Sequence, residues 1–270
     1  MNESGHDDGV QSPDKPITDE APLSPDLISA TSSRDLYVKI LGRETFPKTP
    51  DDLPDFVILP AGLLAPLKGV MPETDSGGKE QGGYLKWDPV SKLLRGRRMR
   101  LSTRSHVVWS AGALNPGFLG QKPSIAIWHS HPNGLYTPSN QDILTANRWS
   151  NSSFIFLTGA GDGISALLRT EEGQKPLDRS SAISIRKSKE LFPDLPKIAE
   201  NAGFGFYVLA PELEVNSNTR SFKRIRPGGI TGMMDQLIDS SGNVVAPTRK
   251  YLKHLRRVEE FKRRKLQENS

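Results

Sequence analysis

The segment Ser124-Ile125-Ala126-Ile127-Trp128-His129-Ser130-His131-Pro132 begins as an apolar run and ends in two histidines one residue apart. Its first half predicts a buried strand, and the Pro-Asn-Gly at 132–134 predicts that this strand gives way to a loop. Side chains alternate between the two faces of a strand, so His129 and His131 are expected to point the same way. The segment therefore predicts a strand that presents two imidazoles at its end.

A helix is expected to open at Pro138-Ser139 and to run to Trp149, with Asp142 in its first turn. Taken alone, Ser139 and Asp142 fit a capping motif, with Ser139 as N-cap and Asp142 near the positive end of the helix dipole. A lone histidine is usually a hydrogen-bonded structural residue. Two histidines on one strand face, followed by a carboxylate, instead match a common ligand set of catalytic zinc, which keeps one position open for water.

Other zinc architectures are excluded by the residues that the chain lacks. There is no cysteine, so no thiolate site exists, and no His-Glu-x-x-His helix occurs. Barrel-type metallohydrolases that begin with a His-x-His pair need further histidines downstream, and only His254 follows. The metal ligands predicted from the sequence are therefore His129, His131 and Asp142.

These residues resemble the motif of the JAMM/MPN-plus (JAB) metalloprotease family, in its prokaryotic-type JAB form. That motif is His-[Ser/Thr]-His-Pro, with seven residues (the proline among them) between the second histidine and a serine, and then an aspartate three residues further on. Residues 132–138 separate His131 from Ser139, and Asp142 follows at the required spacing. The family also places a glutamate before a Gly-Gly strand start. Glu80-Gln81-Gly82-Gly83 fits this pattern, with Glu73 as the second choice.

The resemblance covers about residues 55–172 and implies a zinc-dependent metallopeptidase or isopeptidase with one Zn2+ per chain. Zinc lowers the pKa of its bound water to roughly 7, and a base must then accept the proton and return it to the leaving amine. Glu80 is the candidate base. The resemblance also implies that the Ser139 hydroxyl stabilises the tetrahedral oxyanion. Without the family, Glu80 would be an ordinary solvated loop carboxylate.

Two other functions remain open on the sequence. The segment His131-Pro132-Asn133-Gly134 with Pro138-Ser139 is also compatible with RadC-like DNA-associated proteins, although no helix-hairpin-helix segment is recognisable. A non-catalytic MPN scaffold is the third possibility, but such domains have usually lost their metal ligands. The resemblance implies a ubiquitin-like or other protein substrate, cleaved after its flexible C-terminus, and activating or conjugating enzymes as partners.

The chain around the site reads as an α/β (α+β) protein. Strands are expected at 56–59, 84–87, 98–102, 106–109, 154–157, 164–168, 204–209 and 222–225, and helices at 61–70 and 195–202. The glycine-rich stretch 159–163 predicts a hairpin turn rather than a phosphate loop, because no helix follows it. Mixed strands flanked by helices suit the JAMM/MPN fold, which is cytidine-deaminase-like.

Composition divides the 270 residues into four parts. Residues 1–50 are rich in Asp, Ser, Thr and Pro and are expected to be disordered, so that His6 is no ligand. Residues 51–175 form the predicted metalloprotease domain, and 176–245 an uncertain accessory segment. A chain of about residues 50–215 is accordingly expected to keep zinc and activity. No apolar run approaches the roughly 20 residues of a membrane span and no signal peptide is evident, which predicts a cytoplasmic protein.

The tail, residues 246–270, carries the excess charge of the chain. Nine basic residues stand there against three acidic ones, a local net charge of +6 beside +5 for the whole protein. A solvated helix is the simplest expectation. Clustered Lys and Arg also favour docking onto an acidic protein surface or nucleic acid.

Overall fold

A computed structural model describes residues 15–16, 23–75, 80–98, 123–131, 136–148, 153–161, 163–188, 194–209, 219–227, 237–238 and 244–245. The helices are α1 (Pro25–Ile28), α2 (Ser33–Ile40), α3 (Ala61–Asp75), α6 (Asn140–Arg148), α7 (Arg179–Lys187) and α8 (Leu195–Asn201), with short 3-10 turns at Pro50–Asp52 and Glu172–Gln174. Within these ranges, no helix combines the length and apolarity needed to cross a membrane.

The main sheet has nine strands in the order β1-β4-β3-β5-β6-β7-β8-β9-β2. Their bounds are β1 (Lys15–Pro16), β2 (Phe56–Pro60), β3 (Gly82–Asp88), β4 (Leu93–Arg98), β5 (Ser124–Ser130), β6 (Ser153–Ala160), β7 (Gly163–Arg169), β8 (Phe204–Leu209) and β9 (Thr219–Ile225), while β10 (Leu237–Ile238) and β11 (Val244–Val245) pair separately. In the main sheet only β5 and β6 pair in parallel. A parallel pair needs a crossover connection, and α6 lies in it.

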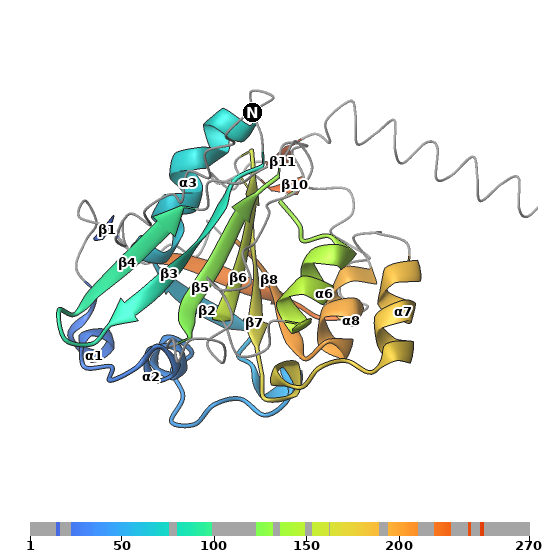
Figure 1. The fold of residues 1–270 in the computed structure, drawn as a ribbon, viewed down its shortest axis with the longest axis horizontal. Coiled ribbons are helices and arrows are strands. Elements are labelled where there is room, and N and C mark those ends of the chain that lie inside the picture. Colours follow the sequence, from blue (N-terminus) through green and yellow to red (C-terminus); the bar gives the residue numbers. More distant parts are fainter. Residues whose placement is uncertain are drawn as a thin grey trace, which may run out of the picture.

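Helices cover both faces of this sheet (Figure 1). On one face α2 and α3 supply Leu36, Tyr37 and three leucines, Leu63, Leu64 and Leu67, to the larger hydrophobic core. On the other face α6 and α8 supply a second core through residues such as Ile143 and Ile198. Every residue of β5 and β6 is buried, as expected for central strands covered on both sides. The mixed α/β class predicted from the sequence is confirmed.

The expectation that residues 1–50 cannot contribute to a core is wrong for residues 23–50. Helix α2 begins at an N-cap, Ser32, whose side chain accepts a hydrogen bond from the Asp35 amide, and it buries Leu36, Tyr37 and Ile40. These apolar residues recur at helical spacing inside a segment whose average composition is polar. The average therefore hid an amphipathic helix. His6 lies outside the described residues.

The predicted boundary near residue 175 is also corrected. Strands β8 and β9 continue the same sheet beyond β7, and β9 pairs with β2, with Phe56 opposite Lys223. Residues 204–209 and 219–225 are thus part of the sheet rather than of an accessory unit. A chain ending at residue 215 would lack β9, and one starting at residue 50 would lack α2. Residues 23–50 and 219–225 therefore both contribute to the described fold.

Most other predicted elements agree with the structure. The 159–163 turn joins β6 and β7 as a hairpin, with Ala160 opposite Gly163. Helix α3 extends to Asp75, so Glu73 belongs to a helix and not to the loop before β3. Of the strand expected at 98–102, the structure describes only Arg98, the last residue of β4, and residues 99–102 lie outside the described part of the chain. The strand predicted at 106–109 and the tail at 246–270 lie outside the described residues.

A fully buried arginine, Arg169, links the two cores at the end of β7. Its guanidinium donates to the carbonyls of Ser153, Gly173 and Ala146, and it lies 4.8 Å from the ring centroid of Phe204. Its own carbonyl accepts a 2.7 Å hydrogen bond from the hydroxyl of Tyr37. Burial lowers the pKa of Arg169 to about 9, which leaves it protonated at neutral pH.

We expect Arg169→Met to lower the free energy of unfolding by at least about 3 kcal/mol, because three buried carbonyls lose their donor. Urea denaturation measures this. Arg95→Met is the control, since Arg95 is partly exposed and pairs with Asp88 at 3.0 Å near the surface. Its loss should stay below about 1 kcal/mol. Equal losses in both variants would contradict the anchoring role of Arg169.

Candidate metal centre

The two histidines lie where β5 ends. His129 is the penultimate residue of the strand and His131 follows it, held in line by a 2.8 Å hydrogen bond from its amide to the carbonyl of Gly159. Strand β3 starts beside this end, with Gly82 directly opposite His129. Glu80 precedes β3 by two residues, so antiparallel pairing brings it to the same place. A 2.7 Å bond from the Ser130 amide to the Gln81 carbonyl fixes that approach.

Asp142 reaches the histidines from the first turn of α6. Its carboxylate accepts from the amide and the hydroxyl of Ser139, both at 2.7 Å, while its own amide donates to the Ser139 hydroxyl at 3.1 Å. This reciprocal pair caps the helix as predicted. Asn140 ties the same turn to α7 through its side-chain amide nitrogen, which donates to the carbonyls of Ile185 and Ser188 near the end of that helix.

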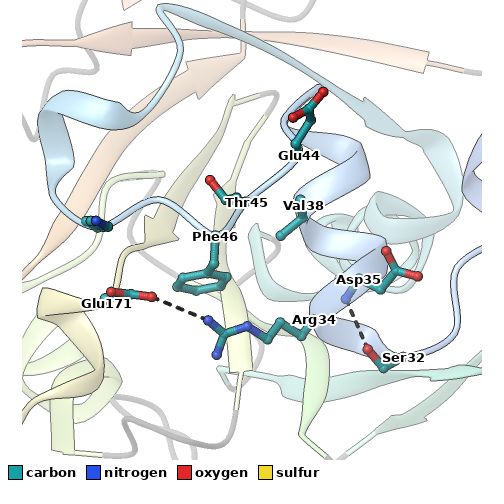
Figure 2. A pocket seen from close by; sticks show the side chains of 9 residues that line it. Ser32, Arg34, Asp35, Val38, Glu44, Thr45, Phe46 and Glu171 are labelled. Carbon is teal, nitrogen blue, oxygen red and sulfur yellow. Dashed lines mark hydrogen bonds and ion pairs between the residues drawn. The ribbon is translucent and has the colours of Figure 1, made fainter.

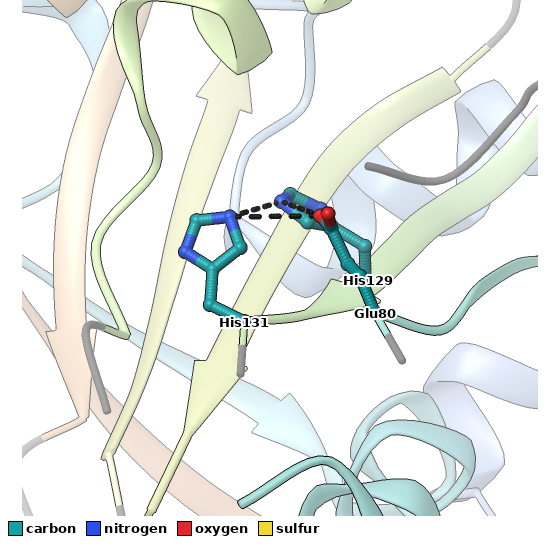
Figure 3. A group of neighbouring side chains, drawn as sticks. All are labelled: Glu80, His129 and His131. Atoms are coloured by element: carbon teal, nitrogen blue, oxygen red, sulfur yellow. Dashed lines mark hydrogen bonds and ion pairs between the residues drawn. The ribbon is translucent and has the colours of Figure 1, made fainter. Parts of the chain in front are cut away.

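The three predicted metal ligands and the predicted base meet at this point. The Nε2 atoms of His129 and His131 lie 2.9 Å apart, and the Asp142 oxygens lie 3.4 Å and 3.3 Å from them. Glu80 Oε1 lies 3.9 Å and 3.8 Å from the same two nitrogens (Figure 3). Glu80, His129 and His131 form a group whose ligand atoms all lie within 4.8 Å of one another and which could hold a metal ion.

The site is buried and its charges are strongly coupled. Glu80 is 4% exposed and His129 is 2% exposed. Burial raises the pKa of the Asp142 carboxyl, but attraction to His129 and hydrogen bonds with both imidazoles outweigh it and hold that pKa well below its usual range. Asp142 is therefore an ionised carboxylate at neutral pH. The Nδ1 atom of His129 finds no hydrogen-bond partner in the described part of the chain, so the polar contacts of this ring are at Nε2.

The sequence predicted which residues meet but not every role that the geometry allows. Glu80, named only as a base, is close enough to both imidazoles to belong to the metal-suited group itself. The Asn140 contacts that fix the start of α6 had no signal in the sequence, because their partners, Ile185 and Ser188, lie far along the chain. Glu73 is in α3, upstream of the loop that leads to Glu80.

Comparison with known proteins adds no family to this geometry: no family model, no curated protein and no solved structure matches the chain. Function is therefore inferred from the residues of the site.

A separate cavity of about 580 Å3 lies between α2, the loop after it and Glu171 (Figure 2). Arg34 lies 4.2 Å from the ring centroid of Phe46 and 3.5 Å from Glu171. Because β7 runs antiparallel to β6, Glu171 follows the end of the strand that is opposite to the histidine end of β5. None of the predicted site residues lines this cavity.

We expect the purified protein to bind about one metal ion per chain, and His129→Ala and Asp142→Ala each to weaken binding by more than the roughly 10–100-fold that loss of an outer partner costs. Metal titration with zinc as the probe measures this. Asp178→Ala is the matched control, because Asp178 caps a different helix, α7, by accepting from the Ser181 amide. Unchanged zinc binding in both His129→Ala and Asp142→Ala would contradict a metal centre at these residues.

Proposed function

We propose that this protein is a zinc-dependent peptidase or isopeptidase of the JAMM/MPN-plus type. The observation that carries the proposal is the meeting of Glu80, His129, His131 and Asp142, which come from three separate segments of the chain. Their order along the sequence and the His-Ser-His-Pro spacing agree with the family motif. The mixed sheet flanked by helices is compatible with a JAMM/MPN fold, which we include in the proposal.

Zinc is the proposed ion because of the donor set and its spacing. Ligand atoms held about 2.0–2.1 Å from a tetrahedral zinc are separated by about 3.3 Å. The separations of Asp142 from the two histidines, 3.3 Å and 3.4 Å, agree with this value. The two Nε2 atoms lie closer together, at 2.9 Å, and Glu80 lies farther from them, at 3.8 Å and 3.9 Å. This difference supports His129, His131 and Asp142 as ligands. Glu80 would then act as a base beside them.

The chemistry divides among the residues of the site. A bound zinc ion supplies a water-derived nucleophile at neutral pH and polarises the scissile carbonyl. Glu80 takes up the proton of the attacking water and returns it to the leaving amine, a task for which its buried position next to the histidines is suited. Ser139 lies within hydrogen-bond distance of Asp142, and its hydroxyl donates to the developing oxyanion when substrate displaces that contact.

The proposed substrate class comes only from the resemblance to the JAMM/MPN-plus motif. We propose a bond after the flexible C-terminus of a ubiquitin-like protein, in a cytoplasmic setting with activating or conjugating enzymes. A base candidate buried beside intact ligands favours an enzyme over an MPN scaffold. The basic tail favours a RadC-like DNA-associated role. We propose that this tail docks on an acidic protein surface or on nucleic acid, which a DNA-binding measurement tests.

We expect Glu80→Gln to keep the fold and the zinc but to lose about 100-fold or more in turnover, since an amide fills the same space and cannot accept a proton. Zinc-dependent cleavage of a ubiquitin-like fusion measures turnover, with chelation and zinc add-back. Glu73→Gln is the matched control and should change little.

Each alternative predicts a different result. Loss of zinc from Glu80→Gln would show that Glu80 is a ligand. Full activity in Glu80→Gln together with loss of activity in Glu73→Gln would assign the role of base to Glu73. If the zinc-loaded parent cleaves no such fusion but binds DNA in a salt-sensitive manner, the peptidase proposal fails and the DNA-associated role replaces it.

A further inference from the structure

A row of residues crosses the sheet at the level of His129. Gly82 on β3, His129 on β5, Thr158 on β6, Ser165 on β7 and Val208 on β8 are successive register partners. Register partners present their side chains on the same face of a sheet. Strands are about 4.8 Å apart, so Ser165, two strands from His129, lies about 10 Å from it. This row, the His129 row, therefore continues from the metal centre onto the β6–β7 hairpin.

Ser165 holds the segment that leads to Asp142. Its hydroxyl, fully buried, donates a 2.6 Å hydrogen bond to the carbonyl of Tyr136. Only Thr137 and Pro138 separate Tyr136 from Ser139, and the proline ring restricts the backbone between them. Because Ser139 and Asp142 are locked together as a cap, fixing the Tyr136 carbonyl also fixes the first turn of α6.

The ring of Tyr136 makes a second contact with the same hairpin. It lies so close to Gly163 that a Cβ atom added there would be 2.1 Å from Cδ1 and 2.4 Å from Cγ of the ring. Any larger residue at 163 would have to push the ring away. The same hairpin also holds His131, through the hydrogen bond from the His131 amide to the Gly159 carbonyl.

We infer that Ser165 and Gly163 are positioning residues for the metal centre, which act by holding Tyr136 and through it Asp142. The inference deepens the proposed function and rests on it. The hairpin and the strand end that carries the histidines belong to one sheet, so the hairpin gives Asp142, which comes from a helix, the same rigid frame as the imidazoles. Outer groups that orient metal ligands typically change affinity by 10–100-fold.

The experiment compares zinc affinity in two matched pairs of variants of the full chain, by competition with a chromogenic chelator. Ser165→Ala is paired with Ser153→Ala, which removes another buried hydroxyl that donates to a carbonyl, that of Ile155 at 2.8 Å, at the opposite end of β6. Gly163→Ala is paired with Gly205→Ala. Gly205 lies in β8, three residues along the strand from the His129 row, and a Cβ atom added there would be 2.6 Å from Leu53.

We expect Ser165→Ala and Gly163→Ala to weaken zinc binding by about tenfold or more. Ser153→Ala and Gly205→Ala should bind zinc like the parent, even where urea denaturation shows that they are less stable. Parent-like affinity in Ser165→Ala and Gly163→Ala, or an equal loss in the control variants, would overturn the inference while leaving the proposed function intact. A parent protein that binds no zinc would overturn both.

Discussion

The parallel pairing of β5 with β6 is the constraint on which the site depends. Antiparallel neighbours can be joined by a tight turn, but a parallel pair must return over one face of the sheet. Here α6 lies in that return, and its first turn therefore sits over the carboxyl end of β5. Strand ends at such a crossover are where open α/β sheets bind ligands. Topology thus brings a carboxylate from a helix, Asp142, to two imidazoles from a strand.

Asp142 serves two structural demands with one carboxylate. As a capping residue it accepts from the amide and the hydroxyl of Ser139, and as a neighbour of the histidines it faces both Nε2 atoms. A helix N-terminus favours an anionic side chain, and so do two imidazoles that share a proton or a cation. Both influences act in the same direction and oppose the cost of burial. Local folding and the chemistry of the site therefore reinforce each other at this residue.

The extent to which the sequence predicted the structure follows from the range of the interactions. His129, His131 and Asp142 lie in one strand-loop-helix unit, so spacing alone predicted that they meet. Glu80 reaches the same point through one further interaction, the pairing of β3 with β5. Two features depend on partners more than a hundred residues away and gave no local signal: the pairing of β2 with β9, and the bond from Tyr37 to Arg169. Average composition even predicted disorder where α2 lies, because the four apolar side chains that this helix buries are few among many polar ones.

These distant contacts nevertheless reach the site. Arg169 binds the carbonyl of Ala146 in the last turn of α6, where a positive charge also suits the helix dipole. The same guanidinium binds the carbonyl of Ser153, the first residue of β6. One side chain therefore joins the end of the crossover helix to the start of the strand that the helix leads to. Tyr37, from the N-terminal segment, accounts for one of the hydrogen bonds that hold this residue, at its carbonyl. The position of α6, and with it that of Asp142, is thus fixed at both ends: by Ser139 and the β6–β7 hairpin where the helix begins, and by Arg169 where it finishes.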